Sequence, residues 1–155
     1  MKVKFVVACP PFSINAFHYA TKRIITADAR EWMQDVIYQM SAPGIEAKLA
    51  QLMQNFDRSK DSIHLSLLFK FPRAQYLTKA GSISSHIPDL SNIEKPLIDI
   101  LFLPKHYGTN PPQTFKNLNI DDKYVTFICS KKTAYDGDKP CIEIGLKVKK
   151  GGQHG

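Results

Sequence analysis

The chain has 155 residues, which predicts a single domain over 1–150 with one hydrophobic core. Its 21 Lys+Arg against 14 Asp+Glu give a formal net charge of +7, which favours a polyanionic partner, with nucleic acid first. No apolar run approaches the ~20 residues of a membrane span, and none of the three cysteines forms a CxxC pair, so neither a membrane protein nor a zinc site is expected. Unpaired thiols in apolar surroundings predict a cytoplasmic protein.

In the first half of the chain, the hydrophobic pattern predicts two strands and two helices. Residues 2–8, KVKFVVA, alternate between polar and apolar and predict a strand. Thr26 is a good N-cap for a helix that runs to about residue 40, and a shorter helix is predicted over 45–56. The run SIHLSLLFKF, 62–71, predicts a second strand.

The second half adds one helix and two strands. A polar loop leads to a predicted helix from about residue 89 to 102, and a long Pro/Asn-rich connection follows. Strands are predicted at 123–132 and 141–149, joined by the turn AYDGDKP as neighbours in the sheet. The tail GGQHG, 151–155, is predicted to be disordered. This order predicts an α+β domain with a small mixed sheet and helices packed on it.

The segment HIPDLSNIEKPLIDILF combines an apolar stripe with several polar residues. At about 100° per residue, Asn92, Lys95 and Asp99 fall on one side of the helix, with Asp89 at its edge as the N-cap. The opposite side is apolar and is formed by Leu90, Ile93, Leu97, Ile100 and Leu101. One interpretation is an ordinary solvated face with a capping aspartate.

A metal site is the other interpretation of these acids. Asp121 and Asp122 stand directly before a predicted strand, where two like charges repel unless solvent or a cation relieves them. Carboxylates from two elements that meet at one point suit Mg²⁺, which prefers oxygen ligands. Such an ion can activate water for phosphodiester cleavage, and a nearby lysine can stabilise the developing charge. We therefore expect Asp89, Asp99 and Asp122 to converge on one cation.

These residues also resemble a known family. The pattern Asp-x-x-Asn-x-x-Lys-x-x-x-Asp, followed about twenty residues later by Asp-Asp-x-x-Val, is similar to that of the RusA family of Holliday junction resolvases. The N-terminal PPFSINAFHYATKR and the closing IEIGL strand resemble that family in the same order. The positions that carry the central pattern are Asp89, Asn92, Lys95, Asp99, Asp121, Asp122 and Val125.

The resemblance implies a RusA-like fold and a homodimeric endonuclease that binds four-way DNA junctions and nicks two strands symmetrically with Mg²⁺, or Mn²⁺ as a substitute. It implies catalytic roles for Asp89, Lys95 and Asp122, with Asp99 and Asp121 as further acidic metal-site positions. It also implies a bacterial source, with a phage or prophage origin possible.

Ser91 departs from the family pattern. The family has Asp-x-Asp-Asn, whereas this chain has Asp89-Leu90-Ser91-Asn92, so a neutral hydroxyl replaces an expected metal ligand. Three outcomes remain open: Asp99 or Asp121 supplies the missing charge, serine suffices at high metal concentration, or the protein binds junctions and cuts them poorly.

DNA contacts are expected in the N-terminal loop and at scattered cations. The resemblance directs that loop toward DNA, and amide, aromatic and basic side chains suit phosphate contact and base stacking. The alternative for each isolated cation is a solvated surface charge, and the alternative for the whole chain is a basic structural module. His64, in the middle of a predicted strand, is interpreted as structural. The candidate DNA contacts are Asn15, His18, Tyr19, Lys22, Arg23, Arg73, Lys79, Asn92, Lys131 and Lys132.

Overall fold

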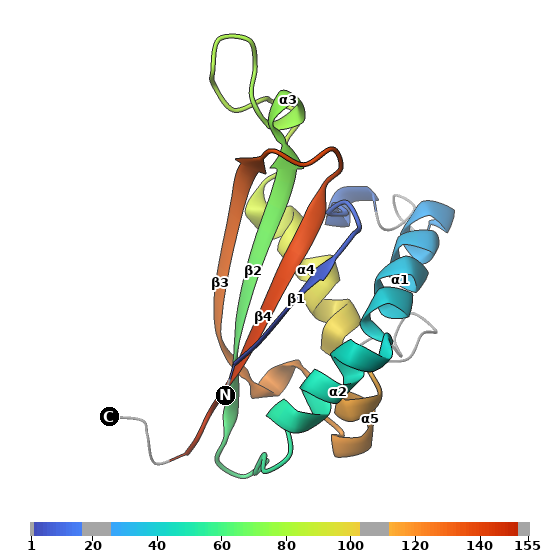
Figure 1. Ribbon diagram of the computed structural model, residues 1–155, viewed down its shortest axis with the longest axis vertical. Helices are drawn as coiled ribbons and strands as arrows, with labels where there is room; N and C mark the ends of the chain where they lie inside the picture. The colour runs from blue at the N-terminus through green and yellow to red at the C-terminus, as the bar shows by residue number, and fades with distance from the viewer. Residues whose placement is uncertain (1, 17–25, 103–111, 152–155) are drawn as a thin grey trace.

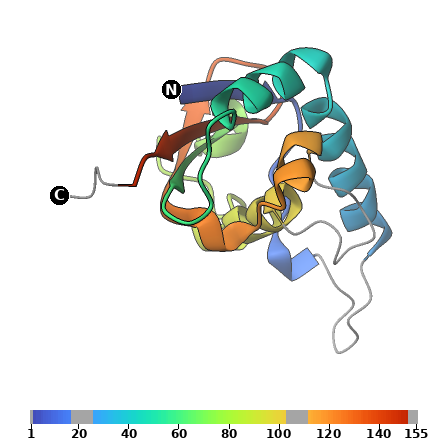
Figure 2. The same cartoon turned by 90° about the horizontal axis from the view of Figure 1, so that it is seen from below.

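The computed structural model describes residues 2–16, 26–102 and 112–151, and these form an α+β fold (Figure 1). A four-stranded mixed sheet carries the helices on one of its faces, as the view from below shows (Figure 2). None of the helices in this part of the chain has the length and apolar character that a bilayer crossing requires. In chain order the elements are β1 (Lys2–Val7), η1 (Ile14–Ala16), α1 (Ala27–Met40), α2 (Pro43–Leu52), β2 (Ser62–Pro72), α3 (Arg73–Tyr76), α4 (Leu90–Phe102), α5 (Gln113–Leu118), η3 (Asp122–Tyr124), β3 (Val125–Tyr135) and β4 (Cys141–Lys149).

Strand β2 lies inside the sheet, whose order is β1-β4-β2-β3. It pairs antiparallel with β4 on one side and parallel with β3 on the other. The predicted neighbour pairing of β3 and β4 was therefore wrong, because β2 lies between them. β2 and β3 are instead joined by a crossover that contains α4, as a parallel pair requires.

The strands alternate between a buried and an open face. In β1, Val3, Phe5 and Val7 are buried while the residues between them are exposed. β2 and β4 follow the same period, so their alternate residues also point away from the helices. The core lies between the inner face of the sheet and the helices, and none of the helices in the described residues covers the outer face of β1, β2 and β4 (Figure 2).

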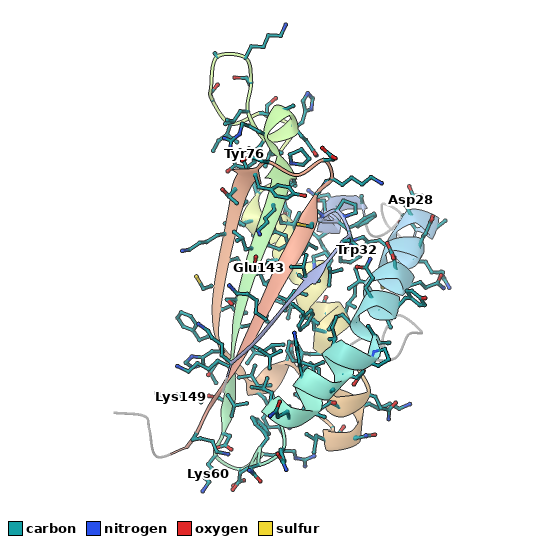
Figure 3. The ribbon with its side chains drawn as sticks, viewed as in Figure 1. Asp28, Trp32, Lys60, Tyr76, Glu143 and Lys149 are labelled. Carbon is teal, nitrogen blue, oxygen red and sulfur yellow. The ribbon has the colours of Figure 1, made fainter. Side chains whose placement is uncertain are left out.

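Helix α1 was predicted closely, from its cap to its core anchor. The Thr26 hydroxyl accepts a hydrogen bond from the Ala29 amide, which satisfies one of the free N–H groups at the helix start. Trp32 is buried against the sheet, and its indole N–H donates to the Pro10 carbonyl at 2.7 Å (Figure 3). This bond ties the segment after β1 to the helix.

Helix α4 forms where it was predicted and runs antiparallel to β3. Its apolar stripe is buried, and Pro96 lies within the helix, also buried. The Lys132 ammonium donates to the Pro88 carbonyl at 3.0 Å, and the Ser130 hydroxyl donates to Glu94 at 2.5 Å. The start of α4 is therefore fixed near the end of β3.

Three short stretches differ from the sequence predictions. Helix α2 begins at Pro43, because proline suits the first helical turn, rather than after the Pro-Gly pair. Helices α3 and α5 form in segments that were predicted as loops, and α5 ends at Asn119 in the left-handed region with φ 54°. Gly151, assigned to the disordered tail, donates its amide to Asp61 at 2.8 Å, and the rest of that tail lies outside the described residues.

Candidate nucleic-acid interface and acidic residues

The N-terminal end of α4 brings several predicted site residues together. Asp89 is exposed directly before the helix, and its carbonyl accepts from the Asn92 amide at 3.1 Å. Ser91 is exposed in the first turn, and Lys132 is held against the neighbouring Pro88. This end thus presents a carboxylate, a hydroxyl, a side-chain amide and an ammonium group.

Asp99 lies elsewhere on the same helix. It follows Asp89 by ten residues, which is about 15 Å of helical rise. Its side chain is mostly buried, and the Lys95 ammonium lies 3.3 Å from one carboxylate oxygen. The expectation that Asp89 and Asp99 meet at one cation was therefore wrong, because a helix of this length separates its two ends. Lys95 pairs with Asp99 along the helix and remains 64% exposed.

Asp121 and Asp122 lie at the opposite end of β3 from Asp89. Asp121 caps the short η3 helix and accepts from the Lys123 amide at 3.1 Å, while Asp122 is exposed. From the start of β3 to Lys132 the strand rises about 23 Å, at about 3.3 Å per residue. Asp122 precedes that start, and Asp89 lies near Lys132.

The acids consequently do not form the expected pocket within one chain. Across residues 2–16, 26–102 and 112–151, no group of three or more His, Cys, Asp or Glu side chains is placed to hold a metal ion. The physical reason is the direction of the strand: β3 runs parallel to β2 and antiparallel to α4, which places Asp89 and Asp122 at opposite ends of β3.

The predicted DNA-contact residues have different surroundings. Asn15 is exposed on η1, which packs against α4, whereas His18, Tyr19, Lys22 and Arg23 lie outside the described residues. Arg73 pairs with Asp136 at 3.2 Å and so ties α3 to the connection after β3. Lys79 and Lys131 are exposed, and neither forms an ion pair with any residue in the described ranges.

The sequence interpretation missed a basic surface on the helix-free face of the sheet. Its lysines alternate with buried apolar residues along three strands, which is a signal that the sequence does contain. Glu143, labelled in Figure 3, is the acidic residue of these strands on this face. It binds Lys4 at 2.8 Å and Lys70 at 2.9 Å. Its hydrogen bonds to Lys4 and Lys70 lower the pKa of the Glu143 carboxyl group. The lysines at these outward positions are Lys2, Lys4, Lys70, Lys147 and Lys149.

Comparisons with known proteins leave the family of this chain open. No family model matches the chain, and no curated protein matches it. The likeness to the RusA family therefore rests on the motifs at 89–99 and 121–125, and a functional proposal has to draw on the geometry and charge of the chain itself.

Proposed function

We propose that this protein is a Mg²⁺-dependent, structure-selective endonuclease that binds four-way DNA junctions as a homodimer and resolves them by paired nicks. Its place of action would be the cytoplasm of a bacterium, where recombining or phage-derived DNA is found. The observation that carries the proposal is the charge arrangement along β3, an edge strand with acids before its start and lysines near its end.

The open edge of β3 suits pairing with a second copy of the chain. Within the described residues, β3 pairs with β2 alone, so its other edge carries free backbone groups. Phe127 and Ile128, in the first half of the strand, are 55% and 39% exposed. A long edge strand with exposed apolar residues is a template for strand addition.

Charge favours an antiparallel arrangement of the two copies. Asp121 and Asp122 precede the strand, and Lys131 and Lys132 lie toward its end. In an antiparallel pair, the acids of one copy lie opposite the lysines of the other, whereas a parallel pair would place like charges together. In this register residue 122 of one strand lies opposite residue 132 of the other, and the pairing uses the backbone edge of β3, so the Phe127 side chain stays on the face of the sheet.

Such a pair would create the acidic site that a single chain lacks. Asp89 is fixed near Lys132 of its own chain through the bond from Lys132 to the Pro88 carbonyl. Asp122 of a second copy would arrive at this same end of β3. Two equivalent sites would result, related by a two-fold axis, which suits paired cuts in a two-fold substrate.

The donor atoms available in this arrangement fit Mg²⁺. Asp89 and Asp122 are exposed, and no described residue hydrogen-bonds to either carboxylate, so both are free to bind a hard cation. Asp121 and Ser91 would add neighbouring oxygens. When bound, the metal would activate water and stabilise the leaving oxygen of the cut strand. Lys131 and Asn92 would position the phosphate, and Lys95, released from Asp99, would stabilise developing charge.

The proposal is tested with a synthetic four-way junction in a gel assay at low salt. We expect a shifted but intact junction in EDTA and symmetric nicks in two strands once Mg²⁺ is added. A linear duplex of the same arms is the control and should remain uncut. Absence of a shift at low salt would leave only a basic domain with no affinity for junctions.

Restoring a carboxylate at position 91 should raise the cleavage rate. Ser91 is exposed two residues after Asp89, so Ser91→Asp adds a charged oxygen donor at the same helix end. We expect roughly tenfold faster nicking at limiting Mg²⁺, on the scale that tuning a metal site commonly produces. Ser85→Asp, exposed in the preceding loop, adds the same charge without the ligand position. Equal rates for wild type and Ser91→Asp would exclude serine as a lost ligand.

A second candidate is a junction-binding protein that does not cut. The neutral Ser91, and the lack within the described residues of a three-acid group in one chain, favour this candidate. The same gel assay separates the two, because this protein would shift the junction and leave it intact with Mg²⁺ or Mn²⁺ present.

A further inference from the structure

A shallow hollow of about 190 Å³ lies on the helix-free face of the sheet. Its rim is formed by Lys2 and Lys147, and His64, Ser66 and Phe127 line it. Gly145 also lines it, and a Cβ at this position would clash with the Ser66 hydroxyl. Glycine therefore keeps this part of the hollow flat, and the sheet here presents an even surface that a planar ring can approach.

An aromatic pair forms one wall of this hollow. The rings of His64 and Phe127 lie 5.2 Å apart between centroids with an interplanar angle of 39°. Phe127 is 55% exposed, which is unusual for a phenylalanine on a strand, and its ring is accessible from the open side. His64, which the sequence suggested was structural, points to this same face and not into the core. Exposed aromatic faces on a sheet are platforms on which nucleobases stack.

The lysines around the hollow differ in whether they form ion pairs. Glu143 already binds Lys4 and Lys70, which leaves those two lysines partly neutralised. Lys2 and Lys147 form no ion pair with any residue in the described ranges, and both are exposed. Two free ammonium groups therefore flank an aromatic surface, and this combination is complementary to a phosphate backbone with an unstacked base.

We propose that this hollow binds an unpaired nucleotide of single-stranded DNA, with the base stacked on Phe127 and the flanking phosphates held by Lys2 and Lys147. The inference deepens the proposed function, because junction arms that open expose unpaired bases. It does not require the acidic residues, and its test needs neither Mg²⁺ nor cleavage.

The stacking part is tested by fluorescence anisotropy with a labelled oligothymidylate in EDTA at low salt. Phe127→Ala should weaken binding about tenfold, within the range for loss of one stacked base. Phe127→Trp should retain the affinity, and its indole fluorescence should be quenched when the oligonucleotide binds. Ile83→Ala is the matched control, because Ile83 is also 55% exposed but lies outside β3 and the hollow.

The phosphate part is tested by the salt dependence of the same binding. Lys147→Gln should weaken binding and reduce the slope of log K against log salt by about 0.7, the contribution of one phosphate contact to a single strand. Lys48→Gln, an exposed lysine on α2, should leave the slope unchanged. Because Lys147 is on β4, this variant also avoids any effect on the β3 edge.

The possible outcomes separate this inference from the proposed function. Failure of the wild-type protein to bind the oligonucleotide, or equal affinity for wild type and Phe127→Ala, would overturn the inference even if junctions are nicked. Oligonucleotide binding that depends on Phe127 and Lys147, with no junction binding or nicking, would support the inference and overturn the nuclease proposal.

Discussion

A mixture of the Asp89→Asn and Asp122→Asn variants should nick a four-way junction, although each variant alone should be at least roughly 100-fold slower than wild type, as expected when a metal ligand is lost. Each asparagine keeps the size of the side chain and removes its charge. Both aspartates are exposed, so neither substitution should disturb the fold. The rescue is expected because the proposed site takes Asp89 from one copy and Asp122 from the other.

The rescue follows from how the substitutions distribute in a mixed dimer. One of its two sites combines both asparagines and is inactive, while the other combines both native aspartates. If instead each chain held its own complete site, a mixed dimer would have one defect in each and would stay inactive. The measurement is single-strand nicking of an end-labelled junction after co-refolding the two variants, with nicks in one strand per dimer.

Two controls accompany this experiment. The Asp89→Asn variant taken alone through the same refolding should regain no nicking activity. Sedimentation should show that the mixture of the two variants is dimeric. Lack of rescue in a dimeric mixture would contradict the shared site, since the distance along β3 leaves no other arrangement in which these two acids act together.

The elements that the sequence predicted well are those with a local cause. The alternation in β1 and β4 determines which residues face the core, and it is visible without knowing the neighbours of a strand. Thr26 and the spacing behind it define α1 in the same way, because a cap and a 3.6-residue period are properties of one segment. The α+β class with a mixed sheet followed from these elements.

The partners and directions of strands were not predictable in the same way. β3 and β4 are separated by a short turn, which suggested a hairpin, yet both pair with β2. The strand that lies between two others is the one that buries the most apolar surface. β2 has buried residues at nearly every second position over its length. The error had a direct consequence for the acids, because the direction of β3 relative to α4 decides whether Asp89 and Asp122 meet.

The basic outer face was missed for a related reason. Each strand contributes only one or two outward lysines, so no segment contains a conspicuous basic run. Only the sheet order brings the lysines of β1, β2 and β4 onto one surface beside Phe127. Candidate sites that lie within one element, such as the start of α4, were located from the sequence, whereas sites assembled from several strands were not.

The interaction expected to matter most for stability is at Asp61, between α2 and β2. Its side chain is fully buried and lies 2.7 Å from the Lys150 ammonium. It also accepts from the backbone amides of Asp57 and Gly151, each at 2.8 Å. This one carboxylate joins the turn before β2 to the end of the described chain. Burial alone would raise the pKa of Asp61, but the bonds to Lys150, Asp57 and Gly151 outweigh it and lower the pKa to about 2.

Asp61→Asn should therefore destabilise the protein by roughly 2 kcal/mol near neutral pH, the equivalent of the lowered pKa at about 1.4 kcal/mol per unit. The sign follows from the depressed pKa in the folded state: the stabilisation is present above the unfolded value near 3.8 and is lost as pH falls toward about 2. Urea unfolding at several pH values measures this, and the two curves of stability against pH should converge at the acid end. Asp138→Asn, which removes an exposed carboxylate in the turn between β3 and β4, should follow the wild-type curve closely. A constant difference between wild type and Asp61→Asn at all pH values would show that shape, and not charge, is what Asp61 contributes.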